Sequence, residues 1–241
     1  MSDTTGHGAD AFFREQRAAF THTLATQGSE AALLQAWDSF DGNVAIQSEG
    51  QPPADCAKGC ASCCTLRVTA LAPEVFVLAD YLRATAPALQ RHGIDLIGAV
   101  READAATRGL HEATRVAARR RCAFVVQGVC LLHRARPLAC RGHASHDRRA
   151  CADAAAGRVD EVPFSGPHRL VRLLLQSALQ AALRDQGKAW GAYKLNHALV
   201  LALDRPGAQA GWKQGEDPLA DAAADLELRA AMAAGFDEMR L

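Results

Sequence analysis

Hydrophobic residues recur at three- and four-residue intervals over most of the chain, which predicts a mainly α-helical protein. Residues 10–38 are expected to form an amphipathic helix or a helix pair, interrupted at Gly28–Ser29. The apolar positions of this segment are Phe13, Phe20, Leu24, Leu33, Leu34 and Trp37. The next helix should begin at Pro73, because proline suits a first helical turn, and should include Val75–Leu82.

Further helices are predicted along the rest of the chain, at about residues 95–119, 168–183, 192–203 and 218–234. The helix at 168–183 has a favourable start in Ser165–Gly166–Pro167 and is rich enough in leucine to be central to the core. Asp204–Gly207 should end the helix at 192–203, and Gly235 should end the last one.

Two regions depart from the helical pattern. Residues 66–69 alternate weakly and predict a short strand, while residues 123–126 and 129–133 predict a β-hairpin around Gln127–Gly128. Because the cysteines lie in such regions, we expect a helical scaffold that carries a small β-hairpin and an irregular, Cys-rich metal-binding module.

The chain divides on this basis into three predicted segments. Residues 1–50 form an N-terminal helical extension, residues 51–215 a cysteine-cluster metal-binding domain with a helical core, and residues 216–241 a C-terminal acidic helix. The last segment holds seven acidic residues against Arg229 and Arg240.

The composition is that of an ordinary globular protein, with 49% hydrophobic and 22% charged residues among 241. The 27 basic and 27 acidic residues balance, so net charge indicates no polyanionic partner. Residues 108–149, however, hold ten arginines against only Glu112 and Asp147. We favour a solvated face near negative thiolates; nucleic-acid binding through Arg119–Arg121 is a weaker alternative.

The interpretation of the eight cysteines depends on the cellular compartment in which the protein resides. Residues 1–10 are polar and no apolar run approaches the length of a membrane span, so we expect a cytoplasmic protein with no membrane partner. In a reducing cytoplasm, clustered cysteines are more often metal ligands than a disulfide framework.

Four thiols lie within nine residues, in the segment Cys56-Ala-Lys-Gly-Cys60-Ala-Ser-Cys63-Cys64. A tight loop can aim thiolates spaced in this way at one ion, and Gly59 supplies the backbone freedom. The adjacent Cys63 and Cys64 point in different directions. One of them is a ligand and the other a packed or reactive thiol, or each binds a different metal; a disulfide between the two is the third option.

The other four thiols are Cys122, Cys130, Cys140 and Cys151. Cys122 and Cys130 flank the predicted hairpin, so strand pairing would bring them close together. Cys151 could be either an eighth ligand or a small buried residue. Together the cysteines suffice for two four-thiolate sites, or for one cluster with thiols to spare.

Neighbouring residues would tune such a site. Arg121, Arg136 and Arg141 lie near cysteines in sequence and could offset thiolate charge, or could be ordinary surface residues. His143 and His146 are three residues apart between Cys140 and Cys151, but we favour a polar loop because thiols are already plentiful.

The cysteine pattern resembles the YkgJ-type cysteine-cluster family of zinc- or iron-chelating proteins, whose signature is CxxCxxCC. The resemblance covers residues 56–151 and rests on the first cluster, on Cys122-Ala-Phe, and on Cys130-Leu-Leu-His-Arg-Ala-Arg-Pro-Leu-Ala-Cys140-Arg. The chain departs from the family in its three-residue first gap and in His133, where an aromatic residue is usual.

The resemblance implies zinc or iron as cofactor, including a 4Fe-4S cluster, and leaves the cellular role undefined. A flagellin lysine methylase carries a similar cluster, so an iron–sulfur enzyme that modifies a protein or small molecule is the main alternative. A partner protein is an open question, and a nucleic-acid-binding zinc protein is the weakest of the three readings.

Overall fold

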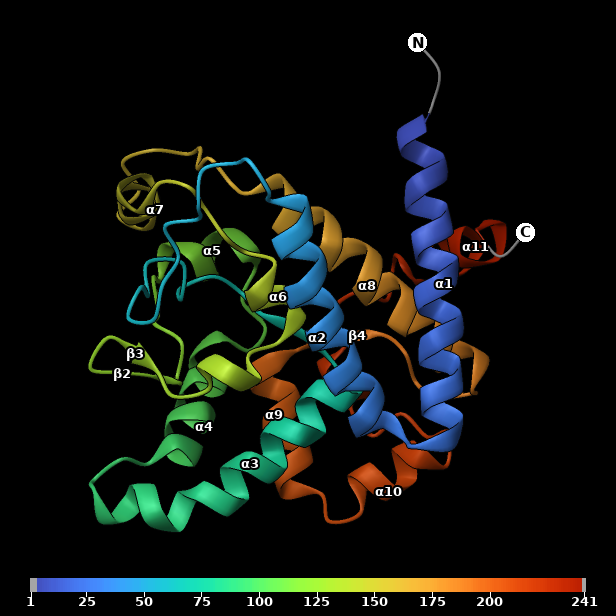
Figure 1. Ribbon diagram of the computed structural model, residues 1–241. Helices are drawn as coiled ribbons and strands as arrows, with labels where there is room; N and C mark the ends of the chain where they lie inside the picture. The colour runs from blue at the N-terminus through green and yellow to red at the C-terminus, as the bar shows by residue number, and fades with distance from the viewer. Residues whose placement is uncertain (1–3, 240–241) are drawn as a thin grey trace.

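The computed structural model describes residues 4–239, and helices dominate it, as predicted (Figure 1). Helix α1 spans Thr4–Thr26 and α2 spans Ser29–Gln47, so the expected helix pair is confirmed and extends beyond residues 10–38. Gly28 lies between the two helices with φ 89°, a backbone angle that glycine adopts without a steric penalty.

Helix α8 (Gly166–Asp185) is the central element of one half of the molecule. It packs against α1 and α2, as Figure 1 shows, and buries Val171, Leu175 and Leu179, which recur every four residues on one face. The leucine-rich helix predicted at residues 168–183 is therefore confirmed in place and in role.

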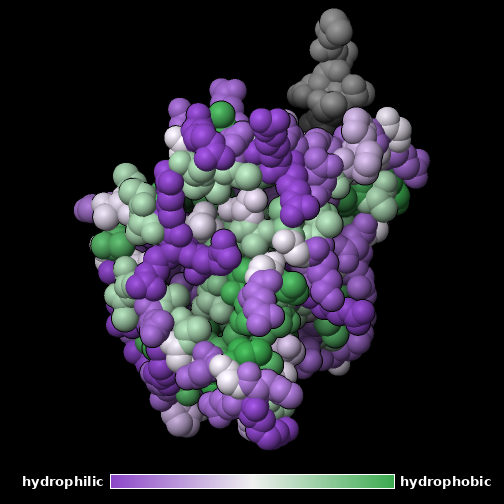
Figure 2. Space-filling model, turned by 90° about the vertical axis from the view of Figure 1, so that its left-hand side faces the viewer, coloured by the Kyte–Doolittle hydropathy of each residue, from purple (hydrophilic) through white to green (hydrophobic). Residues whose placement is uncertain are grey.

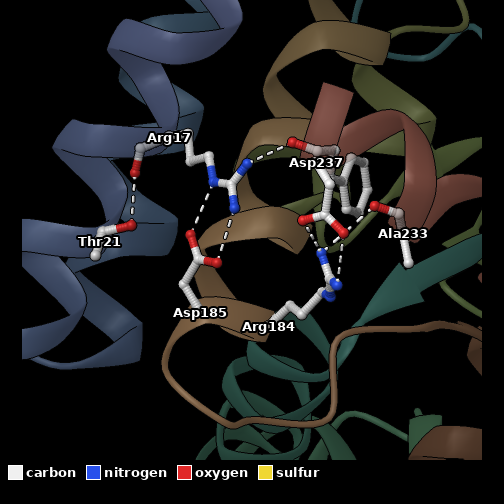
Figure 3. Close-up of polar contacts among 7 residues, drawn as sticks. Arg17, Thr21, Arg184, Asp185, Ala233 and Asp237 are labelled. Carbon is white, nitrogen blue, oxygen red and sulfur yellow. Dashed lines mark hydrogen bonds and ion pairs between the residues drawn. The ribbon is translucent and has the colours of Figure 1, made fainter. Parts of the chain in front are cut away.

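An ion-pair network fixes α1 to α8 and to the C-terminal helix α11 (Arg229–Glu238) (Figure 3). The buried Arg17 of α1 donates two hydrogen bonds to the carboxylate of Asp185, each 2.8 Å long, and a third, 2.7 Å long, to the carbonyl of Phe236. The neighbouring Arg184 pairs with Asp237. A guanidinium held at three acceptors fixes both the spacing and the orientation of these helices.

The other half of the molecule is built on α3 (Ala72–Arg91), α4 (Leu96–Thr107) and α9 (Leu195–Asp204). Strand β1 (Thr69–Leu71) precedes α3 and pairs antiparallel with β4 (Ala192–Lys194), which precedes α9. The helix at Pro73 is confirmed. The predicted strand lies three residues later than expected, and residues 192–194 form a strand instead of the start of a helix, because β1 supplies their hydrogen bonds.

The prediction of one helix over residues 95–119 is wrong. Helix α4 ends at Thr107, Gly109 has φ 75°, and a short helix α5 follows at Glu112–Ala117. A residue with positive φ interrupts the helical hydrogen-bond pattern, so the single periodic segment becomes two helices.

The prediction of a helix over residues 218–234 is also wrong in position. Residues 218–228 hold a 3₁₀ turn, η2 (Ala220–Ala222), and the last helix is α11, which continues through Gly235. The segment before α11 forms hydrogen bonds with β4. Asp225 accepts one from the backbone N–H of Ala192, and Asp217 accepts one from the hydroxyl of Tyr193. The short helix α10 (Ala208–Lys213) was not predicted.

The predicted hairpin is confirmed. Strand β2 (Val125–Val126) pairs with β3 (Val129–Cys130) across Gln127 and Gly128, whose φ values of 50° and 81° match the two-residue type I′ turn. Short elements follow the hairpin: η1 (His133–Ala135), α6 (Leu138–Arg141) and α7 (Arg148–Ala155).

One hydrophobic core draws on all three predicted segments, since it includes Phe13, Leu175 and Phe236. The boundaries at residues 50 and 215 stay a prediction. Within residues 4–239, no helix combines the length and the apolar character that a membrane span requires.

Candidate metal centre

All eight cysteines are free thiols and occupy irregular segments or short elements. They belong to the loop Cys56–Cys64, the segment before β2, strand β3, and helices α6 and α7. Figure 1 draws β2, β3 and α7 on the side of the molecule opposite α11. Figure 2 turns this side to the viewer, where hydrophilic side chains surround a more hydrophobic area near the middle of the face.

The loop Cys56–Cys64 is attached to the rest of the fold at both ends. Before it, the backbone N–H of Asp55 donates to the carbonyl of Ser145 (2.9 Å). After it, the N–H of Leu195 donates to the carbonyl of Val68 (3.0 Å), next to the β1–β4 pair. Gly59 has φ 94°, a positive backbone angle that glycine adopts readily, as expected for this position.

A backbone hydrogen bond joins the two sequence clusters directly. The N–H of Cys122 donates to the carbonyl of Cys64, with an N···O distance of 2.6 Å. A second connection is made by Ser145, whose N–H lies 3.3 Å from the Sγ atom of Cys56. Backbone segments 58 positions apart in sequence, the separation of Cys64 and Cys122, therefore lie side by side.

Four thiols form what we term the loop group: Cys56, Cys60, Cys63 and Cys151. Burial raises the pKa of Cys56, and the other three thiols raise it further by electrostatic repulsion. Burial likewise raises the pKa of Cys151, with added repulsion from Cys63 and Cys60. Cys151, which the sequence left open, is thus near enough to the loop to interact electrostatically with its thiols.

Three thiols form the hairpin group: Cys122, Cys130 and Cys140. Burial raises the pKa of each of them. Cys140 experiences the charges of both Cys122 and Cys130, and Cys122 experiences that of Cys130, so the three lie within range of mutual electrostatic repulsion. In the hairpin Cys130 pairs with Val125, and Cys122 lies three residues before Val125, so strand pairing does not place Cys122 opposite Cys130.

The adjacent Cys63 and Cys64 lie between the two groups. A hydrogen bond with the Cys64 thiol raises the pKa of Cys63, and burial adds to this effect. Cys63 also interacts electrostatically with Cys122 of the hairpin group. Since both residues are free thiols, the disulfide alternative for this pair is wrong.

Of the three arginines near cysteines in sequence, Arg136 has the clearest effect on the thiols. Its positive charge lowers the pKa values of Cys63, Cys130 and Cys140, which partly opposes the effect of burial. Arg141 instead binds Asp41 of α2 and stacks over Trp37, with its guanidinium carbon 5.0 Å from the ring centroid. It therefore positions the helix that carries Cys140.

Glu74 and Ser145 were not identified from the sequence. Fully buried Glu74 accepts hydrogen bonds from the N–H groups of Leu71 (2.8 Å) and Leu138 (2.7 Å), and so connects α3 to α6. Glu74 lies in the first turn of an apolar helix, and this position could have indicated a helix-capping role. No sequence pattern indicates the role of Ser145, because that role depends on the tertiary fold.

The histidines make contacts other than with the thiols. The ring of His143 packs on Phe164 (4.6 Å between centroids), and burial lowers its pKa. His146 Nδ1 lies 3.3 Å from the carbonyl of Pro53, and His133 Nε2 lies 3.2 Å from Arg136. The contact of His146 agrees with the polar loop expected there, whereas His143 is packed against an aromatic ring.

Over residues 4–239, no three or more Cys, His, Asp or Glu side chains are arranged in a group that could hold a metal ion. The thiols are thus gathered but do not surround a common point, and their role as ligands stays a prediction. Comparison with protein-family models, with curated proteins and with solved structures gives no match for this chain.

Proposed function

We propose that this protein binds zinc or iron, the latter as an ion or as a 4Fe-4S cluster, through the thiols of the loop group, the hairpin group and Cys64. The observation that carries the proposal is the juxtaposition of two distant cysteine clusters, joined by the Cys122–Cys64 backbone bond. Thiolates are soft ligands that favour zinc and iron–sulfur centres over hard cations.

The grouping favours two metal sites. Cys56, Cys60, Cys63 and Cys151 provide four thiols, and Cys122, Cys130 and Cys140 need only Cys64 to make a second set of four. Each of the adjacent cysteines then serves a different metal, which avoids straining the backbone between them. Binding requires the thiols to come closer together, because no three of them are arranged to hold an ion within the described residues.

Crowded, partly buried thiols also give a physical reason for a bound cation. Bringing several thiolates together without one is opposed by both burial and mutual repulsion, whereas a cation neutralises them. Arg136 would supply part of the remaining charge compensation. A reducing, cytoplasmic location belongs to the same proposal, since it keeps all eight thiols available.

The resemblance to the YkgJ-type family is kept as part of this proposal, and the cellular role stays open. A second candidate function is an iron–sulfur enzyme that modifies a protein or small molecule. The observation that favours it is a cavity of about 320 Å³ whose wall includes Cys64 and Cys122. Nucleic-acid binding remains the weakest alternative, with no specific observation in its favour.

Metal analysis of anaerobically purified protein tests the proposal. Stoichiometric zinc in colourless protein would support a zinc protein and weaken the enzyme alternative. Brown protein with visible absorption, iron and acid-labile sulfide would support an iron–sulfur centre. Protein that retains neither metal, and takes up neither Zn²⁺ nor Fe²⁺ with sulfide under anaerobic reconstitution, would disprove the proposal.

A further inference from the structure

The cavity beside Cys64 and Cys122 has a volume of about 320 Å³ and is formed by five separate parts of the chain. They are the end of the cysteine loop with the segment after it, the end of α4 with the turn that follows it, the region from α5 to Cys122, the junction of β4 with α9, and η2. Residues distant in sequence thus enclose a space large enough for a small metabolite.

Cationic side chains dominate the walls of this cavity. They are Arg67, Arg108, Arg115, Arg120, Arg121 and Lys194. The acidic residues that line it are Asp104 and Asp221. Six positive charges against two negative ones leave an excess of positive charge here, although the whole chain has no net charge. The charge balance of this space is therefore a local property.

Both acidic residues already have cationic partners. The buried Asp104 forms an ion pair with Arg108, and Asp221 forms one with Arg205 (2.8 Å), which does not line the cavity. A further acid, Glu112, pairs with Arg67 (2.6 Å) and Arg115 (3.4 Å). These contacts hold part of the cationic wall in place and already engage both carboxylates that line the cavity among the described residues.

Three cations remain available to a ligand: Arg120, Arg121 and Lys194 are exposed. Within the part of the chain that the structure describes, they form no hydrogen bond or ion pair through their side chains.

The cavity contains one oriented imidazole. His197 Nδ1 lies 3.2 Å from the carboxylate of the buried Asp104, so its other ring nitrogen, Nε2, is left free of that contact. Leu66, Val68 and Leu195 supply apolar wall. Several cations, one oriented imidazole and an apolar surface along the same cavity are the ingredients of a small-molecule site.

We propose that this cavity binds a small molecule carrying one or more phosphate groups. Guanidinium and ammonium groups both match phosphate oxygens, and arginine donates bidentate hydrogen bonds to them. These side chains line one cavity of about 320 Å³, which favours a compact phosphate ester over a polynucleotide that tracks a long basic surface. The proposal does not depend on whether the neighbouring thiols bind metal.

Calorimetric titration of the full-length, metal-characterised protein with pyrophosphate and with inorganic phosphate, at constant ionic strength, tests this inference. We expect saturable pyrophosphate binding that is tighter than phosphate binding. The double variant Arg120→Gln with Arg121→Gln should weaken it about a hundredfold, roughly tenfold for each charge-assisted interaction lost. The matched control, Arg14→Gln with Arg91→Gln, removes two exposed arginines elsewhere and should bind as wild type does.

The metal content of the two double variants should equal that of wild type, which separates this proposal from the metal proposal. Equal weakening in the test and control variants would overturn it, because general electrostatic attraction would then explain binding. Absence of saturable pyrophosphate binding would overturn it as well. A single-stranded RNA oligonucleotide that binds with a steep salt dependence, and that pyrophosphate does not displace, would support the nucleic-acid alternative instead.

Discussion

The backbone N–H of Leu138 donates a 2.7 Å hydrogen bond to the buried carboxylate of Glu74, and this bond places helix α6 against the start of α3. Cys140 lies two residues after Leu138 on the same short helix. The other oxygen of Glu74 accepts from the N–H of Leu71 (2.8 Å), where β1 meets α3. One side chain therefore connects the helical scaffold to a thiol of the hairpin group.

Replacement of Glu74 by alanine should destabilise the fold by about 2–4 kcal/mol, because two buried N–H groups lose their acceptor and a cavity remains. Urea unfolding followed by circular dichroism measures the change. Glu102→Ala, at an exposed acid on α4, is the matched control and should change the free energy of unfolding by less than about 0.5 kcal/mol. A similar effect in both variants would contradict the role of Glu74.

The pH dependence of stability should also reflect Glu74. Burial raises the pKa of Glu74 above its ordinary value of 4.5, so the folded state holds this proton more tightly than the unfolded state. The resulting stabilisation is complete below pH 4.5 and declines as pH rises through the higher folded pKa. The free energy of unfolding of wild type, minus that of Glu74→Gln, should therefore fall from pH 4 to pH 8; a rise would contradict the sign.

Removal of single thiols should distinguish the two groups. Cys60→Ser and Cys63→Ser should each reduce bound metal and soluble yield, because metal binding contributes to folding. Cys151→Ser should lower metal content as Cys56→Ser does, since both belong to the loop group. Elemental analysis measures each loss, and Ser62→Ala is the control within the same loop. Unchanged metal in both Cys60→Ser and Cys63→Ser would refute the ligand assignment.

Two arginines at the junction of α1, α8 and α11 should differ in their effect on stability. Arg17 is buried and binds three acceptors, so Arg17→Ala leaves Asp185 without its partner and should cost about 3–5 kcal/mol. Arg184→Ala removes a more exposed pair with Asp237 and should cost at most about 1 kcal/mol. Thermal unfolding compares the two, and equal losses would contradict this ranking.

The turn of the hairpin should be sensitive to a single methyl group. Gly128 has φ 81°, which L-residues with a side chain adopt only with strain, so Gly128→Ala should cost about 1 kcal/mol. The control is Gly235→Ala: this glycine lies within α11 and an added Cβ meets no atom within 4 Å, so alanine should stabilise by about 0.5–1 kcal/mol. Urea unfolding measures both signs.

Local patterns were sufficient for the elements that depend on local chemistry. The break at Gly28, the start of α3 at Pro73, helix α8 and the turn at Gln127–Gly128 each follow from residues within a few positions. The predictions for residues 192–194 and 218–228 were wrong for the opposite reason. Their hydrogen bonds go to β1 and to β4, which lie far away in sequence and override local periodicity.

The candidate site divides in the same way. Spacing located the hairpin beside Cys122 and Cys130, since hairpin pairing is local. The inclusion of Cys151 in the loop group, the use of Arg141 to hold α2, and the pairing of Asp104 with His197 all depend on tertiary contacts. No spacing rule contains that information.

The antiparallel pairing of β1 with β4 has a practical consequence for any attempt to isolate the cysteine region. A fragment that ends after Cys151 would lack residues 192–195, whose backbone anchors the chain just beyond the thiol loop. It would also lack α8, against which α6 packs. A peptide cut out at those limits should fail to reproduce the natural arrangement of sulfurs, so transferring this arrangement to another scaffold would require the supporting helices to be carried with it.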